Sequence, residues 1–127
     1  MHIVEVIGRI FLSILFLING ISKILYYKGT LEYMENFGVP GYLIYPAIIT
    51  EILFPILLMI GYKTKLSAII LASFTILLAV IFHTEFSNPM QLTAFLKNFA
   101  IAGGFIIIFV YGPGQYSIDH MLESRQK

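Results

Sequence analysis

One apolar stretch, Ile3–Leu25, constrains the fold of this chain most, because it is long enough to span a bilayer and yet carries three charges. At a rise of ~1.5 Å per residue, a helix of this length covers the ~30 Å of a hydrocarbon core. Its three charged residues and three others recur every three or four positions, on one helical face. These positions are Glu5, Arg9, Ser13, Phe16, Gly20 and Lys23. Lipid does not solvate such a stripe, so we predict that it faces protein or water.

Three more apolar runs of spanning length follow, at residues 42–60, 66–82 and 95–111. Hydrophobic residues make up 58% of the chain and charged residues 12%, against ~45–50% and ~25% in soluble domains. We therefore predict an all-α, polytopic membrane protein in contact with the lipid bilayer. Its single domain, residues 1–127, would form an antiparallel four-helix transmembrane bundle.

The segments between the spans are short. Residues 26–41 have apolar residues at every third position and end in a Gly-Val-Pro-Gly turn, which predicts a short interfacial helix. Residues 61–65 are too few for anything but a tight turn between antiparallel helices. After the last span, Ser117 is placed to cap a final short helix that runs through Leu122.

Composition excludes several classes of function. A net charge of +1 with scattered basic residues does not provide a nucleic-acid surface. The absence of cysteine excludes thiolate metal sites and the disulfide-forming membrane oxidoreductases. The three histidines fall at different depths, His2 and His120 on one side and His83 on the other, so we expect no metal site.

Basic residues also indicate how the bundle is oriented. With both termini in the cytoplasm, four basic residues lie inside and two outside, as the positive-inside rule requires. The inside group is Lys63, Lys65, Arg125 and Lys127, and the outside group is Lys28 and Lys97. We therefore predict that both termini are cytoplasmic.

Glu51 is the charged residue that most needs a partner, because it lies in the middle of the second span. If the first two spans start at the same level, Glu51 lies ~13 Å and Arg9 ~9 Å from the inner surface. We predict a buried ion pair between Arg9 and Glu51, with Glu5 one turn below Arg9. The pair can be structural, or Glu51 and Arg9 can be catalytic residues that handle protons or bind a ligand.

A second group of polar residues gathers near the outer end: Asn19, Lys23, His83 and Asn98. Each of them alone is typical of a side chain that reaches the headgroup layer. Together they can line an entrance for a lipophile with a polar head. A quinone has this shape, with carbonyl oxygens that accept hydrogen bonds and a ring that packs on aromatic side chains.

Several of these residues, with a distinctive C-terminal motif, resemble the DoxX family of small four-helix bacterial membrane proteins. The motif is Gly-Pro-Gly-x-Tyr-Ser-x-Asp at residues 112–119, with Gln115 where relatives often carry Arg. The other matching residues are Arg9, Phe16, Gly20, Lys23, Glu51, Gly61, Thr64, Lys65, Lys97, Asn98, Gly103 and Gly104. The resemblance implies a location in the inner (cytoplasmic) membrane. It also implies a redox association, since some relatives are subunits of a thiosulfate:quinone oxidoreductase and others are membrane partners of redox-stress enzymes.

We therefore predict a quinone-interacting redox subunit or accessory of a membrane oxidoreductase, with quinone as the cofactor and a redox enzyme as partner subunit. Two alternatives stay open. A non-catalytic scaffold or assembly partner would use the buried charges only to hold its helices together. A small transporter would need a homo-oligomer and a continuous polar path, whereas only Ser13 lies between the two polar groups on the first span.

Overall fold

A computed structural model describes residues 2–126, and the side chains of residues 3–125. The elements are α1 (His2–Leu25), α2 (Tyr27–Asn36), the 3-10 turn η1 (Gly41–Leu43), α3 (Ile44–Ile60), α4 (Thr64–Phe82), α5 (Pro89–Tyr111) and α6 (Ile118–Gln126). Four stretches are long and apolar enough to cross a membrane: Ile3–Leu25, Gly41–Ile60, Thr64–Phe82 and Pro89–Tyr111. The predicted all-α bundle of four membrane-spanning helices is confirmed.

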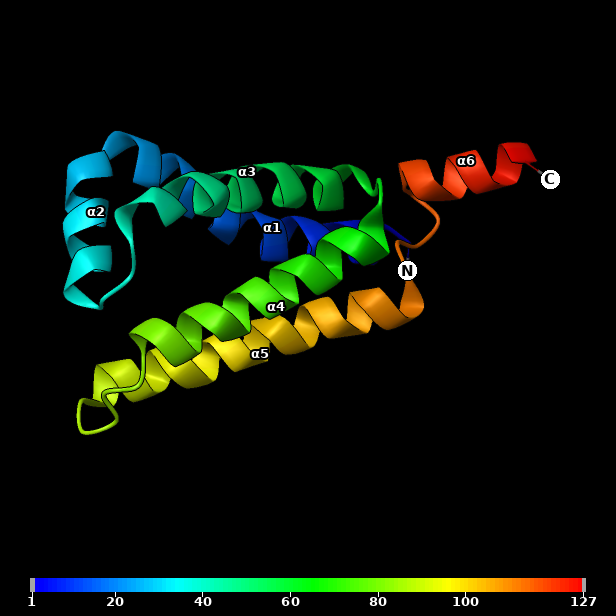
Figure 1. Ribbon diagram of the computed structural model, residues 1–127. Coiled ribbons are helices and arrows are strands. Elements are labelled where there is room, and N and C mark those ends of the chain that lie inside the picture. The colour runs from blue at the N-terminus through cyan, green and yellow to red at the C-terminus, as the bar shows by residue number, and fades with distance from the viewer. Residues whose placement is uncertain (1, 127) are drawn as a thin grey trace.

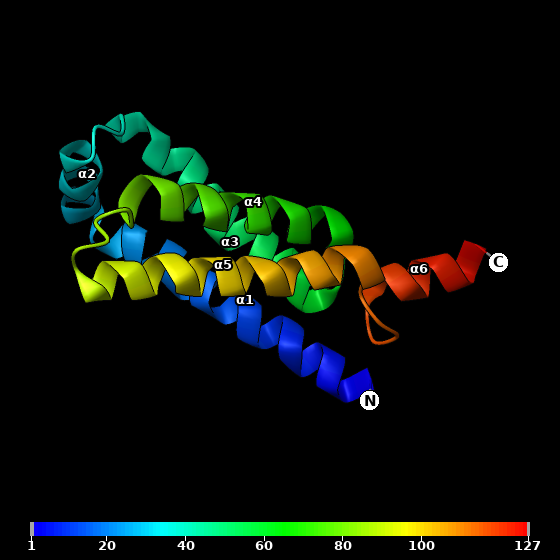
Figure 2. The same cartoon turned by 90° about the horizontal axis from the view of Figure 1, so that it is seen from below.

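The four long helices form two antiparallel pairs, with α1 packed along α3 and α4 packed along α5. The pairs meet near the α3–α4 turn and diverge toward the opposite end, where α2 lies across the bundle (Figure 1). Both termini and α6 lie at the end of the α3–α4 turn in both views (Figures 1 and 2). We call this the terminal end and the other the α2 end.

Two helices begin earlier than the hydropathy pattern predicts, because their first turns are capped. α5 begins at Pro89 rather than at residue 95, since the Asn88 side chain accepts a hydrogen bond from the Met90 N–H. α4 begins at Thr64 rather than at residue 66, and its first N–H groups bond to a carboxylate of α6. Hydropathy alone does not register these polar first turns.

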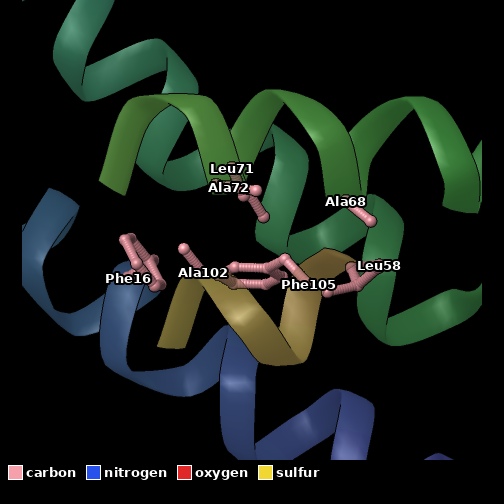
Figure 3. Packing of buried hydrophobic residues seen from close by; sticks show 7 residues of the cluster. All are labelled: Phe16, Leu58, Ala68, Leu71, Ala72, Ala102 and Phe105. Carbon is pink, nitrogen blue, oxygen red and sulfur yellow. The ribbon is translucent and has the colours of Figure 1, made fainter. Parts of the chain in front are cut away.

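A small hydrophobic core holds the two pairs together (Figure 3). Phe16 of α1 meets Phe105 of α5 edge to face, with the ring centroids 5.5 Å apart. Ala68 and Ala72 on α4 and Ala102 on α5 are buried beside them, and such small residues let membrane helices approach closely. Large apolar side chains cover the outside of the bundle, as expected where lipid is the solvent.

The predicted short helix in the connector is α2, which is tied to α3 and α4 by aromatic side chains. The Tyr27 and Tyr45 hydroxyls lie 2.7 Å apart and join α2 to α3. Tyr33 stacks on Phe82 of α4, with the ring centroids 5.3 Å apart. These contacts hold α2 across the α2 end of the bundle.

Candidate functional site

Glu51 forms its ion pair with Lys23, not with Arg9. The Lys23 Nζ lies 2.9 Å from Oε1 and 2.7 Å from Oε2 of Glu51. The Glu51 side chain is 1% exposed and that of Lys23 is 23% exposed. The prediction that Arg9 and Glu51 form a buried pair is therefore wrong, and Glu51 belongs with Lys23 instead of with Arg9.

The error arises from the relative height of α1 and α3. A Cβ added at Gly20 would lie within 2.8 Å of Ile52 and 3.2 Å of Glu51, so α1 meets the middle of α3 near its own C-terminal end. Counting back along both antiparallel helices, the last residue of α3 is level with the residues around Leu12. Nearly three turns at the start of α1 therefore extend beyond α3, and Arg9 lies level with the α3–α4 turn instead of with Glu51.

Arg9 is buried at the terminal end, where it holds the C-terminal segment against the α3–α4 turn. Its Nη1 donates to the Leu58 carbonyl over 3.3 Å, and its Nη2 donates to the Tyr116 carbonyl. Gly61 has a left-handed backbone, φ +74°, and a Cβ there would collide with Arg9 and Ser117. Only glycine therefore fits the turn at this point.

Asp119 also ties the C-terminal segment to the α3–α4 turn, and we call this set of contacts, made by Arg9, Gly61, Ser117 and Asp119, the clasp. Its two carboxylate oxygens accept the Lys63 and Thr64 N–H groups, each over 2.8 Å, and so cap the start of α4. The Asp119 N–H donates to the Gly61 carbonyl over 2.8 Å. As predicted, Ser117 caps α6, by accepting the His120 N–H. The Gly-Pro-Gly-x-Tyr-Ser-x-Asp motif thus fastens α6 to the bundle.

A cavity of about 640 Å³ opens at the α2 end, between the diverging helix pairs and beneath α2. We call it the α2-end cavity. Three of the four predicted ligand-binding residues line it: Asn19, Lys23 and His83. The fourth, Asn98, does not line it and instead donates to the Thr75 carbonyl over 3.3 Å, which joins α5 to α4. The Lys23–Glu51 pair lies at the edge of this cavity, with Lys23 in its wall.

Most of the residues that line the cavity were not predicted from the sequence to be functional. Tyr33 and Met34 come from α2, and Phe74 and Leu78 come from α4. Their contribution depends on α2 lying across the bundle, for which the sequence has no local signal. Partial burial raises the pKa of the Tyr33 hydroxyl above its ordinary value.

His83 is held at the rim of the cavity by a side chain from the start of α5. Its Nδ1 lies 3.0 Å from Oε1 of Gln91. Among the described side chains, no three metal-ligating residues come together; the His2 side chain lies outside the described part. The charged side chain in the cavity wall is thus neutralised by its ion-pair partner, and the other polar groups of the wall are uncharged hydrogen-bonding side chains such as Asn19 and Thr50.

Comparison with known proteins identifies the family. The DoxX family profile matches residues 4–84, which include Arg9, Lys23, Glu51 and His83. The chain belongs to the DoxX family. It is 39% identical over 119 residues to the inner membrane protein YqjF of Escherichia coli K12, covering 94% of this chain and 92% of that protein. It is 32% identical over 120 residues to the inner membrane protein YphA of the same organism, covering 89% of this chain and 86% of that protein. No solved structure matches significantly.

Proposed function

We propose that this DoxX protein binds a quinone in the α2-end cavity and acts as a redox subunit or accessory of a membrane oxidoreductase. The observation that carries the proposal is the combination in one cavity of apolar and aromatic walls with the ammonium group of a buried ion pair. A volume of about 640 Å³ falls within the ~300–1,000 Å³ of typical small-molecule sites.

The charge balance of the cavity favours a neutral ligand. Lys23 has three N–H donors, and two of them are used by the two oxygens of Glu51. The third is available to a carbonyl oxygen, while Glu51 cancels the charge that would otherwise attract an anion. A quinone carbonyl suits this donor, and the ring and its apolar tail suit Phe74, Tyr33 and Met34.

In the proposed reaction, a bound quinone would be reduced to hydroquinone by two electrons and by two protons taken from water at the membrane surface. The electrons come from a partner redox subunit. Negative charge develops on the quinone oxygen as electrons arrive, and the Lys23 ammonium at that oxygen stabilises it. Glu51 is a positioning residue, since it holds Lys23 at the cavity wall.

Binding can be tested on the purified protein in mild detergent or nanodiscs, by titration with a short-chain ubiquinone analogue. Gly29 lines the cavity and a Cβ there meets nothing within 4 Å, so Gly29→Leu adds a larger side chain at the cavity wall without a Cβ clash. We expect Gly29→Leu to weaken binding at least tenfold. The matched control is Gly8→Leu, which is equally free of clashes but lies at the terminal end. No binding to the wild type, or equal binding to both variants, would overturn the proposal.

A substitution in the Lys23–Glu51 pair distinguishes this proposal from the scaffold alternative. In a folded Glu51→Gln variant, a neutral amide replaces the carboxylate whose two oxygens hold Lys23, so we expect weaker quinone binding and lost redox activity in the cell. A scaffold keeps every phenotype in that variant. The scaffold alternative has its own support in α6, since the side chains of Met121 and Leu122 are 56% and 41% exposed beyond the bundle.

We further propose that both termini face the cytoplasm. Lys63, Lys65 and Arg125 lie at the terminal end, whereas Lys28 belongs to α2 at the other end; Lys127 lies outside the described residues. Because the chain has no cysteine, a single cysteine at Ser124 can report on sidedness. We expect a membrane-impermeant maleimide to label Ser124→Cys in inverted vesicles and not in intact spheroplasts. The reverse pattern would place the termini outside.

A further inference from the structure

A second cavity, of about 440 Å³, lies at the terminal end between the first turns of α1 and the last turns of α5. The two helices touch where the side chain of Leu12 packs against Gly104, with 3.3 Å to an added Cβ. From there α1 runs away from α5 toward its N-terminus (Figure 2). The result is a wedge-shaped opening, the terminal-end crevice, which the quinone proposal does not use.

Two opposite charges line this crevice in a protein whose spans carry few charges. Arg9 is 3% exposed, and its Nε–H has no acceptor among residues 2–126. Glu5 lies one turn away on the same face of α1, with its carboxylate against Gly114, where φ is +82° and a Cβ would collide with Oε2. A carboxylate has about four acceptor positions, so Glu5 can bind a ligand in addition to its contacts within the protein.

The position of the crevice indicates what surrounds it. Tyr111 lines it at the end of α5 and is 83% exposed, which is the placement of an aromatic side chain at the headgroup layer. Leu12, Ile107 and Ile108 line the part nearer the bundle centre. The crevice is thus polar at headgroup depth and apolar at acyl-chain depth.

We propose that the terminal-end crevice binds a phospholipid with a phosphoethanolamine headgroup. The phosphate accepts hydrogen bonds from Arg9, the ammonium donates to Glu5, and an acyl chain packs along Leu12 and Ile107. Contact with Nε requires a small shift of the Arg9 side chain, since that atom is covered. The shift is favourable because it gives the Arg9 Nε–H a hydrogen-bond acceptor, and a buried N–H without an acceptor is costly.

Other phospholipids fit the two charges less well. An anionic headgroup without an amine, such as phosphatidylglycerol, would bring its phosphate to Arg9 but would have no ammonium group to neutralise Glu5. Phosphatidylcholine has a quaternary ammonium with no N–H to donate to the carboxylate. The preferred ligand is therefore the zwitterion with a primary amine, by about tenfold, the factor that one charge-assisted hydrogen bond supplies.

The test is lipid retention. The full chain is reconstituted into vesicles of equal parts phosphatidylethanolamine, phosphatidylglycerol and phosphatidylcholine, re-extracted in mild detergent, and analysed by native mass spectrometry. We expect about one retained phosphatidylethanolamine per chain in the wild type and in Gly29→Leu. Gly8 lines the crevice and a Cβ there meets nothing within 4 Å, so Gly8→Leu adds a larger side chain at the crevice wall without a Cβ clash and should lose this lipid.

A second variant tests the charge argument without filling space. Glu5→Gln keeps the size of the side chain but removes the acceptor charge, so we expect the preference to move from phosphatidylethanolamine to phosphatidylglycerol. Retained lipid in the bulk ratio, or equal retention by Gly8→Leu and the wild type, would overturn the proposal. Because Gly29→Leu serves as the control here, failure of the lipid proposal is separate from failure of the quinone proposal.

Discussion

Lys23→Met should destabilise the bundle more than Glu51→Gln, because the two partners of the ion pair differ in exposure. The Glu51 side chain is 1% exposed, whereas that of Lys23 is 23% exposed and lines the α2-end cavity. In Lys23→Met the carboxylate stays buried without its partner, which costs about 3–5 kcal/mol. In Glu51→Gln the ammonium can turn into the cavity while the amide still accepts a hydrogen bond, so we expect a loss of about 1–2 kcal/mol.

The double variant Lys23→Met/Glu51→Leu removes both charges and replaces them with apolar side chains. Replacement of a whole buried pair is often neutral, so we expect its stability to lie within about 1 kcal/mol of the wild type. The free energies can be measured by unfolding in mixed micelles with increasing SDS, followed by helical circular dichroism. Equal losses in the two single variants, or a double variant as unstable as their sum, would refute the assignment of this pair.

Two further predictions concern the clasp and α2. Asp119→Ala removes the cap of α4, so it should lower the free energy of unfolding by about 1–2 kcal/mol in the same assay. It should also make α6 accessible to limited proteolysis. An unchanged digestion pattern would contradict the role of Asp119 in the clasp. Burial raises the pKa of Tyr33, so the folded state holds its proton more tightly and the associated stability is lost as pH rises above about 10. Tyr33→Phe should therefore flatten the fall in stability above pH about 10, and an equally steep fall would contradict the effect of burial.

The membrane-spanning helices were predictable because the hydrocarbon core imposes a minimum length of apolar sequence. The stripe on α1 was also informative, since Arg9, Ser13 and Phe16 are all buried. Which charge pairs with which was not predictable, because it depends on the relative height of two helices. Gly20 determines that height by its close contact with Glu51 and Ile52, and a single small residue in a sequence does not reveal its neighbour.

The α2-end cavity shows a second kind of limit. Lys23 and His83 are far apart in the sequence, and their shared depth was readable from helix lengths alone. The aromatic wall of the cavity could not be predicted in this way, because it requires the helix pairs to diverge and α2 to lie across the space between them. Polar residues in a membrane span therefore point to a site, while the shape of the site depends on packing between helices.

Substitutions at Gly8 and Gly29 allow a final prediction about whether the terminal-end crevice and the α2-end cavity act independently. The stripe on α1 supplies Arg9 to one cavity and Lys23 to the other, and at ~1.5 Å per residue these lie roughly 20 Å apart along the helix. Phe16 lies between them in the hydrophobic core. Sites this far apart without shared partners act independently, so the double variant Gly8→Leu/Gly29→Leu should lose phosphatidylethanolamine and quinone to the same extent as each single variant. If Gly8→Leu instead changed the quinone affinity, α1 would couple the two cavities, and the stripe would have to be treated as one site.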